Sequence, residues 1–129
     1  MVRSLWESCG ARIVRLDAKT HDEIFAAVSH LPHVVAFALV SMLAQRPNAS
    51  TLLGFSGAGL RDTVRIAGSS PEMWRDICIA NRDPILAALD GYLSDLEAVR
   101  GMVEASDGPG LAVKFSTARN ARAKWIKPQ

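Results

Sequence analysis

The chain has 129 residues, which suits one domain with a hydrophobic core. Its 15 Lys and Arg against 13 Asp and Glu give a net charge of +2, too small to indicate a nucleic-acid-binding surface. Two cysteines do not make a disulfide framework, no secretory leader is recognisable, and the longest apolar run (residues 31–43) is too short for a membrane span, so we expect a soluble cytoplasmic protein with reduced thiols.

The first nineteen residues predict a helix end followed by one strand. Gly10 stands where glycine often follows a helix, and residues 11–16 are rich in the β-branched residues that favour strands. One strand has no partner within the chain. We therefore interpret residues 1–19 as the remnant of a preceding domain, with pairing to the same strand of a second copy as the alternative.

The next segment predicts two consecutive helices. Thr20 and Glu23 form a capping-box pattern, which places the first helix start at His21. Pro32 predicts a kink or break at residues 29–31 and then the first turn of a second helix, which runs to about Gln45. Because that second helix is apolar nearly all round, we expect it at the centre of the fold.

Three more helices are expected in the second half. Ser70-Pro71 and Asp83-Pro84 are start signals for helices at residues 71–81 and 84–105, and a loop at residues 107–110 precedes a final helix at 111–126. The longest helix carries a heptad seam of Ile85, Leu89, Tyr92, Leu96, Val99 and Val103. The sequence therefore predicts an all-α fold of five to six helices, with surplus apolar surface that a second copy covers.

A candidate binding site lies in residues 55–76. Gly57 and Gly59 permit positive φ angles or close approach of the backbone to a ligand. Arg61 and Arg65 share one helix face, and an aspartate at position 62 is spaced to hold one of the guanidinium groups. Paired guanidinium groups suit an organic carboxylate. The alternative is a surface helix whose arginines are merely solvated.

Other chemistries lack their motifs. Residues 57–62 miss the third glycine and the preceding strand of a dinucleotide-binding loop, and Ser56 lacks the following glycine of a nucleophile elbow. A metal site needs a full set of ligands and an outer shell. No such groups stand at metal-binding spacing around His21, His30 and His33. We therefore expect no metal site and no NAD binding by this chain alone.

Two blocks of sequence carry a family resemblance. GAGLRDTVRIAGSSPEMWRDICIANRD at residues 57–83, together with His-Asp-Glu at 21–23 and Ser-His-Leu-Pro-His at 29–33, resembles the C-terminal helical domain of prephenate and arogenate dehydrogenases. The likeness runs from about residue 5 to about residue 125. It implies a substrate pocket in which Arg65 binds a carboxylate, with the other contributions from His33, Trp74, Asp62, Gly57 and Gly59.

The resemblance also implies a reaction and an assembly. These enzymes oxidatively decarboxylate prephenate to 4-hydroxyphenylpyruvate in tyrosine biosynthesis, using NAD or NADP held by an N-terminal domain that also carries the catalytic histidine. Residues 20–129 would then be the dimerisation domain, supplying a homodimer contact and half of the substrate pocket, with no catalytic residue of its own. We expect the isolated chain to be inactive.

Two other functions fit the same helices. One is a free-standing helical dimer that binds an aromatic amino acid such as tyrosine as a regulatory module. The other is a purely structural dimerisation domain. A Gly-x-Gly-x-x-Gly after a strand, about 150 residues upstream in the reading frame, would favour the dehydrogenase.

Overall fold

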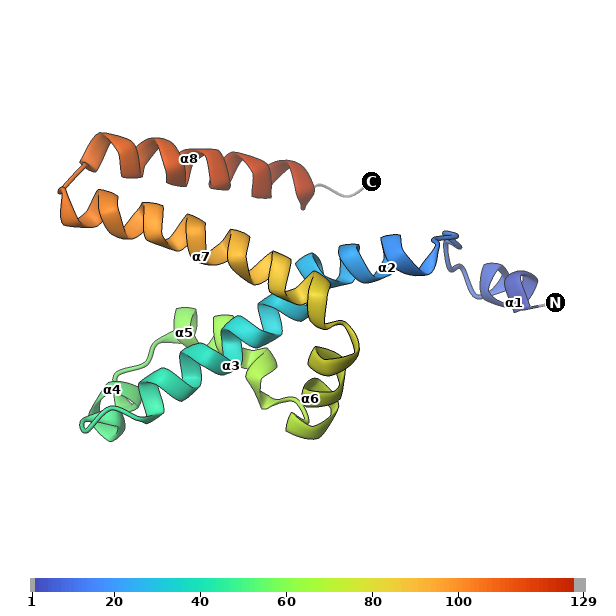
Figure 1. Cartoon of the computed structure of the whole chain (residues 1–129), viewed down its shortest axis with the longest axis horizontal. Coiled ribbons are helices and arrows are strands. Elements are labelled where there is room, and N and C mark those ends of the chain that lie inside the picture. Colours follow the sequence, from blue (N-terminus) through green and yellow to red (C-terminus); the bar gives the residue numbers. More distant parts are fainter. Residues whose placement is uncertain (1, 127–129) are drawn as a thin grey trace. The chain divides into compact units, whose positions relative to one another are not determined.

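The computed structural model describes residues 2–126, which form helices joined by short connections (Figure 1). The all-α prediction is confirmed, since no strand occurs among these residues. The elements are α1 (Val2–Ser8), α2 (Ala18–Phe25), the π-helical turn η1 (Ala26–His30), α3 (Leu31–Ala44), α4 (Ala49–Gly54), α5 (Ala58–Val64), the 3-10 turn η2 (Arg65–Gly68), α6 (Pro71–Ala80), α7 (Arg82–Glu104) and α8 (Gly108–Trp125).

The strand expected at residues 11–16 is absent from the single chain. α1 ends at Ser8, and the predicted Gly10 follows it with a φ of +80°, which suits glycine. Residues 11–17 then have no regular secondary structure. A strand is stabilised by hydrogen bonds to a neighbouring strand, and residues 2–126 contain no strand that could pair with it. Pairing with a second copy remains a prediction.

α2, η1 and α3 form one helix of 27 residues, Ala18–Ala44. Of the kink or break predicted at residues 29–31, the break is therefore wrong, whereas the π-helical turn η1 overlaps the place of the predicted kink. The backbone N–H of Leu31 donates to the carbonyl of Ala26, five residues earlier, which is the bond of a π-helical turn. Proline has no N–H to donate, and the widened turn carries the helix past it without interruption.

This long helix begins earlier than the capping-box pattern predicted. Asp17 is its N-cap: the carboxylate accepts hydrogen bonds from the backbone N–H of Thr20 at 3.0 Å and from the Thr20 hydroxyl at 2.6 Å. These bonds favour the charged carboxylate and lower the pKa of Asp17. The start predicted at His21 was wrong because Asp17, three positions before the expected cap Thr20, caps the first turn instead.

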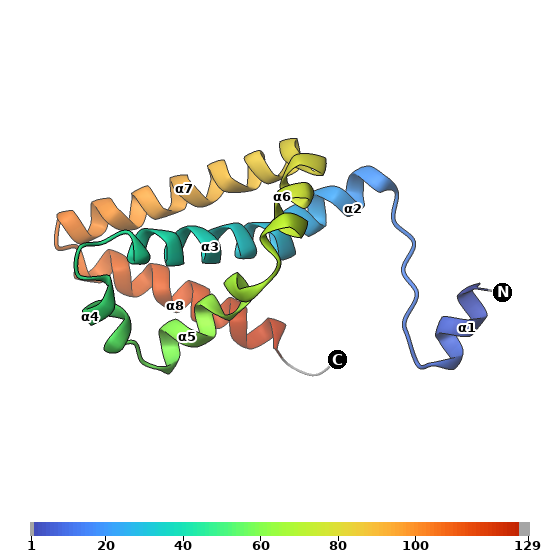
Figure 2. The same ribbon diagram turned by 90° about the horizontal axis from the view of Figure 1, so that it is seen from below.

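The long helix is central but poorly covered by its own chain. α3 packs against α4, α5 and η2 (Figure 2). Ala26 and Ala36 are buried along the long helix. Only 11% of its most apolar 18-residue window is buried, and by length and composition it could span a membrane. The chain therefore exposes more apolar helix surface than the apolar run at residues 31–43 alone suggested.

The starts of the later helices follow their caps. Ser70 caps α6 as predicted, with its hydroxyl accepting from the N–H of Met73 at 3.3 Å. α7 begins at Arg82, slightly before the predicted Pro84. α8 begins at Gly108, because the Asp107 carboxylate accepts from the N–H of Gly110 at 2.9 Å and turns most of the predicted loop into a first helical turn.

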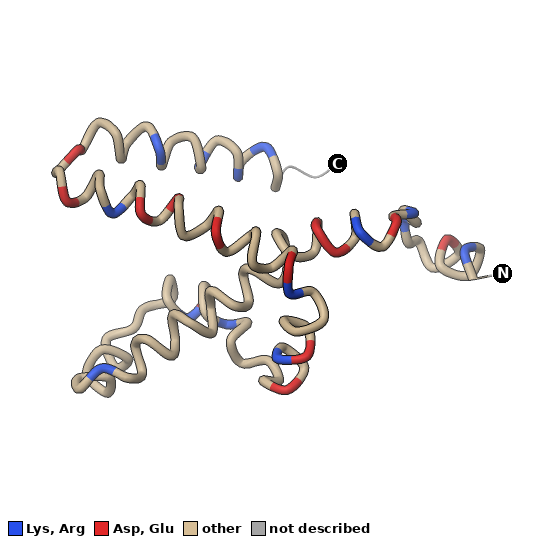
Figure 3. The backbone as a smooth tube through the Cα atoms, viewed as in Figure 1, with Lys and Arg blue, Asp and Glu red and all other residues tan. Residues whose placement is uncertain are grey.

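The chain divides into two compact units, one extending to Ala88 and the other beginning at Leu89. The second unit is an antiparallel pair made by the rest of α7 and by α8, joined by an ion pair between Lys114 and Asp95. None of its described residues is buried, and the seam residues Leu96 and Val103 are 45% and 60% exposed. α8 carries basic residues and no acidic ones (Figure 3).

Candidate functional site

The first candidate site surrounds Trp74 of α6, a residue that is only 8% exposed. The His33 ring stacks on the indole, with ring centroids 3.7 Å apart and planes inclined by 18°. The His30 ring meets it edge-on, at 6.0 Å and 73°. Two residues predicted for the pocket, His33 and Trp74, are thus in direct contact although 41 positions separate them in the sequence.

The hydrogen bond of His33 fixes which ring nitrogen carries the proton. Its Nδ1 lies 2.8 Å from the backbone carbonyl oxygen of Ser29, one turn earlier in the long helix. A carbonyl can only accept, so Nδ1 donates and the neutral ring keeps Nε2 free as an acceptor. The half-buried His33 therefore offers a hydrogen-bond acceptor to a ligand hydroxyl or amine.

Asn81 connects this contact to the helix that precedes it. Its side chain is 8% exposed, at the junction of α6 and α7. The Nδ2 atom lies 2.9 Å from the backbone oxygen of Asp22 and 3.0 Å from Nδ1 of His30. We refer to His30, His33, Trp74 and Asn81 together as the Trp74 cluster.

The charge state of His30 follows from its surroundings. Burial disfavours the protonated ring and lowers the pKa of His30, and the positive charge of protonated His21 and His33 acts in the same direction. The Asp22 carboxylate opposes the shift. His30 is therefore kept neutral to lower pH than an exposed histidine.

The Trp74 indole N–H is buried and has no hydrogen-bond partner in the described part of the chain. An unpaired buried donor costs free energy, and no polar contact orients the indole. Its position therefore rests on contacts of its rings, with His33 on one face and the edge of His30 beside it.

The arginine segment, residues 57–65, has a different character. Arg61, Asp62 and Arg65 are all exposed. Gly57 caps α5 with a φ of −86°, so positive φ is not the reason for glycine here, and a side chain added at Gly57 or Gly59 would meet open space. Close approach of a ligand to these glycines remains a prediction.

Arg65 lies in the 3-10 turn η2 rather than in α5 itself. No ion pair within 4.0 Å joins it to Asp62 among the described residues, although the spacing suggested one. η2 and α5 both pack against α3, which carries His33. The fold therefore places the arginine segment beside the long helix, and its guanidinium groups have no acceptor among residues 2–126.

A shallow hollow of about 320 Å³ lies beside Trp74. Its walls are almost entirely apolar, and its one charged lining residue is Arg75, whose Nε donates to Asp76 at 2.8 Å. The lining residues are Val34, Phe37, Pro71, Trp74, Arg75 and Cys78. A flat apolar ring is the kind of group that such walls accept.

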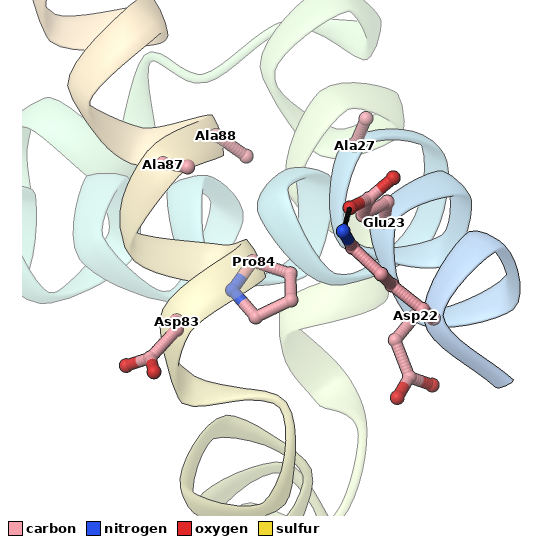
Figure 4. A pocket seen from close by; sticks show the side chains of 8 residues that line it. Asp22, Glu23, Ala27, Asp83, Pro84, Ala87 and Ala88 are labelled. Carbon is pink, nitrogen blue, oxygen red and sulfur yellow. Dashed lines mark ion pairs between the residues drawn. The ribbon is translucent and has the colours of Figure 1, made fainter.

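A larger hollow, of about 880 Å³, lies between α2 and the start of α7 (Figure 4). It has a floor of small apolar side chains and a charged rim, in which Lys19 pairs with Glu23 at 3.9 Å. Asp22 and Asp83 add further carboxylates, and Figure 4 shows both pointing away from the floor. No sequence pattern indicated this hollow.

Metal binding finds no support in residues 2–126, where no three histidine, cysteine or acidic side chains converge. His21 instead contacts Asp22 at 3.1 Å and the Phe25 ring at 4.3 Å.

Asn81 is the functional candidate that the sequence did not single out. It lies inside the block that carried the family resemblance, but an asparagine between two helices gives no sign of contacts more than 50 positions away.

Residues 17–117 match the family described as the dimerisation domain of prephenate dehydrogenase. The chain is 36% identical over 122 residues to a prephenate dehydrogenase of Bacillus subtilis, covering 94% of this chain and 33% of the relative. It is 33% identical over 123 residues to a cyclohexadienyl dehydrogenase of Zymomonas mobilis, covering 94% and 42%. The chain thus spans less than half the length of these relatives.

Solved structures agree with the sequence relatives. A prephenate dehydrogenase from Aquifex aeolicus, in complex with hydroxyphenyl propionate and NAD+, superposes with a TM-score of 0.87 at 33% identity, covering 95% of this chain and 43% of that one. An arogenate dehydrogenase from Synechocystis gives a TM-score of 0.87 at 26% identity, covering 97% and 46%. The match again falls on part of each relative.

Proposed function

Because the chain belongs to the prephenate dehydrogenase dimerisation-domain family, we propose that it forms the dimer contact and one wall of the substrate pocket in a prephenate or arogenate dehydrogenase. The parent reaction would be the oxidative decarboxylation of prephenate, or its arogenate counterpart. The observation that carries the proposal is the direct stacking of His33 on Trp74, two residues that the family resemblance had already placed at the pocket.

The residues of the wall suit a ligand with a ring at one end and a carboxylate at the other. The apolar hollow beside Trp74 accepts a flat ring, and the free Nε2 of His33 accepts a hydrogen bond from a hydroxyl. Arg65, exposed and without an intrachain acceptor among the described residues, binds the carboxylate through two parallel N–H groups. The hydroxyphenyl propionate held by the Aquifex aeolicus relative has both features.

We also propose that residues 2–126 do not hold the nicotinamide cofactor. A dinucleotide site needs a strand, a glycine-rich turn and a helix in succession, and the described residues contain no strand. We therefore assign NAD or NADP, together with the catalytic histidine, to another part of the parent enzyme. The role proposed for this chain is to bind and orient the substrate.

Dimerisation would cover the apolar surface that the chain leaves open. The long helix Ala18–Ala44 is mostly unburied, and the seam of α7 is exposed at Leu96 and Val103. Exposed apolar side chains of this kind mark an interface. We assign the surface to a second copy rather than to lipid, because the matching family is a dimerisation domain, and we place the protein in the cytoplasm.

A ligand titration followed by NMR tests the pocket. 3-(4-Hydroxyphenyl)propionate is added to the chain, and its neutral amide, which keeps the ring but lacks the negative charge, serves as the matched ligand. We expect saturable shifts at His33 and Arg65, with the amide binding at least tenfold more weakly because a charge-assisted hydrogen-bond pair is lost. No saturable change at either residue, or equal affinity for acid and amide, would contradict the proposal.

A further inference from the structure

Asn81 joins two parts of the chain that are far apart in sequence. The side chain is buried, and its Nδ2 atom contacts both the backbone oxygen of Asp22 and Nδ1 of His30. These partners lie 59 and 51 positions before it. A buried amide fixed at both contacts holds the junction of α6 and α7 against the long helix.

The partners determine which way every hydrogen points. The Asp22 carbonyl can only accept, so the NH2 group of the amide must face it. That group has two hydrogens, and the second is directed to His30 at 3.0 Å. Nδ1 of His30 is therefore the acceptor, and the neutral ring carries its hydrogen on Nε2.

The His30 ring in turn bears on Trp74. It contacts the indole edge-on, while His33 stacks on the indole face. Because the indole N–H has no partner in the described residues, these ring contacts replace a hydrogen bond in orienting Trp74. A rotation of His30 would leave one side of the indole unsupported and alter its stacking on His33.

From this arrangement we propose that Asn81 is a positioning residue for the substrate wall. It fixes the orientation and tautomer of His30, and through His30 and Trp74 it fixes the plane in which His33 presents Nε2. Asn81 makes no hydrogen bond to Trp74 or His33 within the described residues, and it acts on them only through His30. The role at the substrate rests on the function proposed above, whereas the effect on the rings does not.

Two substitutions at Asn81 and one control separate positioning from general stability. Asn81→Ala removes both hydrogen bonds. Asn81→Asp keeps the size but offers only acceptors, so it favours a hydrogen on Nδ1 of His30. Ser70→Ala removes the N-cap of the same helix, α6, and weakens that helix without touching either histidine ring.

The first measurement is the nitrogen and proton NMR spectrum of the histidine rings without ligand. In the unmodified chain we expect the hydrogen of His30 on Nε2 and a ring-current shift at the His33 protons from the stacked indole. Asn81→Ala should reduce that shift by at least half, and Asn81→Asp should move the His30 hydrogen to Nδ1. Ser70→Ala should change neither.

The second measurement is the affinity of the folded variants for 3-(4-hydroxyphenyl)propionate. We expect Asn81→Ala to weaken binding about tenfold and Ser70→Ala to leave it within twofold. Unchanged His33 shifts in Asn81→Ala, or unchanged affinity where the unmodified chain binds, would overturn the proposal. A hydrogen on Nδ1 of His30 in the unmodified chain would overturn it even if Asn81→Ala failed to fold. The titration of the unmodified chain tests the substrate pocket separately.

Discussion

The Trp74 cluster and the arginine segment lie on neighbouring elements and differ in how far the chain itself completes them. In the cluster, each histidine has a hydrogen bond at Nδ1 and a contact with the indole. In the arginine segment, Arg61 and Arg65 are exposed and have no carboxylate partner within 4.0 Å among the described residues.

The difference separates stability from binding. Side chains that pack against one another hold the fold whether or not a ligand is present. Exposed guanidinium groups contribute little to folding, because solvent screens them, and they keep their full capacity to bind an anion. Replacing the buried Trp74 should therefore act mainly on stability, and a substitution in the arginine segment mainly on ligand affinity.

The largest expected effect is that of Trp74→Ala on stability. Removing a buried indole loses its transfer free energy and leaves a cavity, which costs about 3–5 kcal/mol. Denaturant unfolding followed by circular dichroism measures the change. Trp125→Ala is the matched control, because that indole is 82% exposed. A loss below about 1 kcal/mol for Trp74→Ala would mean that the cluster does not hold the fold.

Arg65→Ala should act on binding. We expect a loss of about 2–3 kcal/mol in the affinity for the substrate or its analogue, the scale of a charge-assisted hydrogen-bond pair, with stability changed by less than about 0.5 kcal/mol. Arg65→Lys should recover only part of the loss, since an ammonium cannot make a planar two-pronged contact. Binding and turnover are best measured in the full-length parent.

Arg61→Ala provides the comparison for Arg65. Both side chains are exposed and four positions apart, so a general charge effect would weaken binding equally in the two variants. A larger loss for Arg65 than for Arg61 assigns the carboxylate contact to Arg65. If Arg65→Ala in the full-length parent leaves the KM and kcat unchanged, Arg65 is a solvated surface arginine.

The smallest effect should be a pH dependence that belongs to the cluster. The pKa of His30 is lowered in the folded chain, so the unfolded chain takes up a proton at higher pH. The stability from this group is therefore complete above the ordinary histidine pKa and is lost as the pH falls below it. We expect the free energy of unfolding to decrease from about pH 7.5 to about pH 5.5, and His30→Gln to reduce that slope.

Ser70→Ala is the control for the pH experiment, because it weakens the N-cap of α6 and removes no histidine. It should leave the slope in place. An equal slope in the His30→Gln variant and the unmodified chain would show that His30 does not titrate differently on folding.

The sequence predicted the fold class better than the details of the long helix. Helix signals such as Ser70-Pro71 are local, and the cap bond to Met73 confirms that one. Pro32 misled because a π-helical turn lets the helix pass a proline, and no local pattern distinguishes that from a break. The expected strand failed because strand formation needs a partner segment.

The pocket could be predicted only in part, for a related reason. His33 and Trp74 were singled out from the family resemblance, and the fold stacks their rings together. The partners of Asn81 depend on how α6 and α7 pack against the long helix, which residue spacing within one segment does not contain. The roles of Asp62, Gly57 and Gly59 remain predictions.

The mass of the chain in solution tests the central claim most directly, because an exposed long helix and α7 seam are consistent with this account only if a second copy covers them. Sedimentation equilibrium at micromolar concentration measures it. We predict twice the 13.9 kDa mass of one chain, with the helical content of the fold described here. A folded monomer of 13.9 kDa under those conditions would contradict the account.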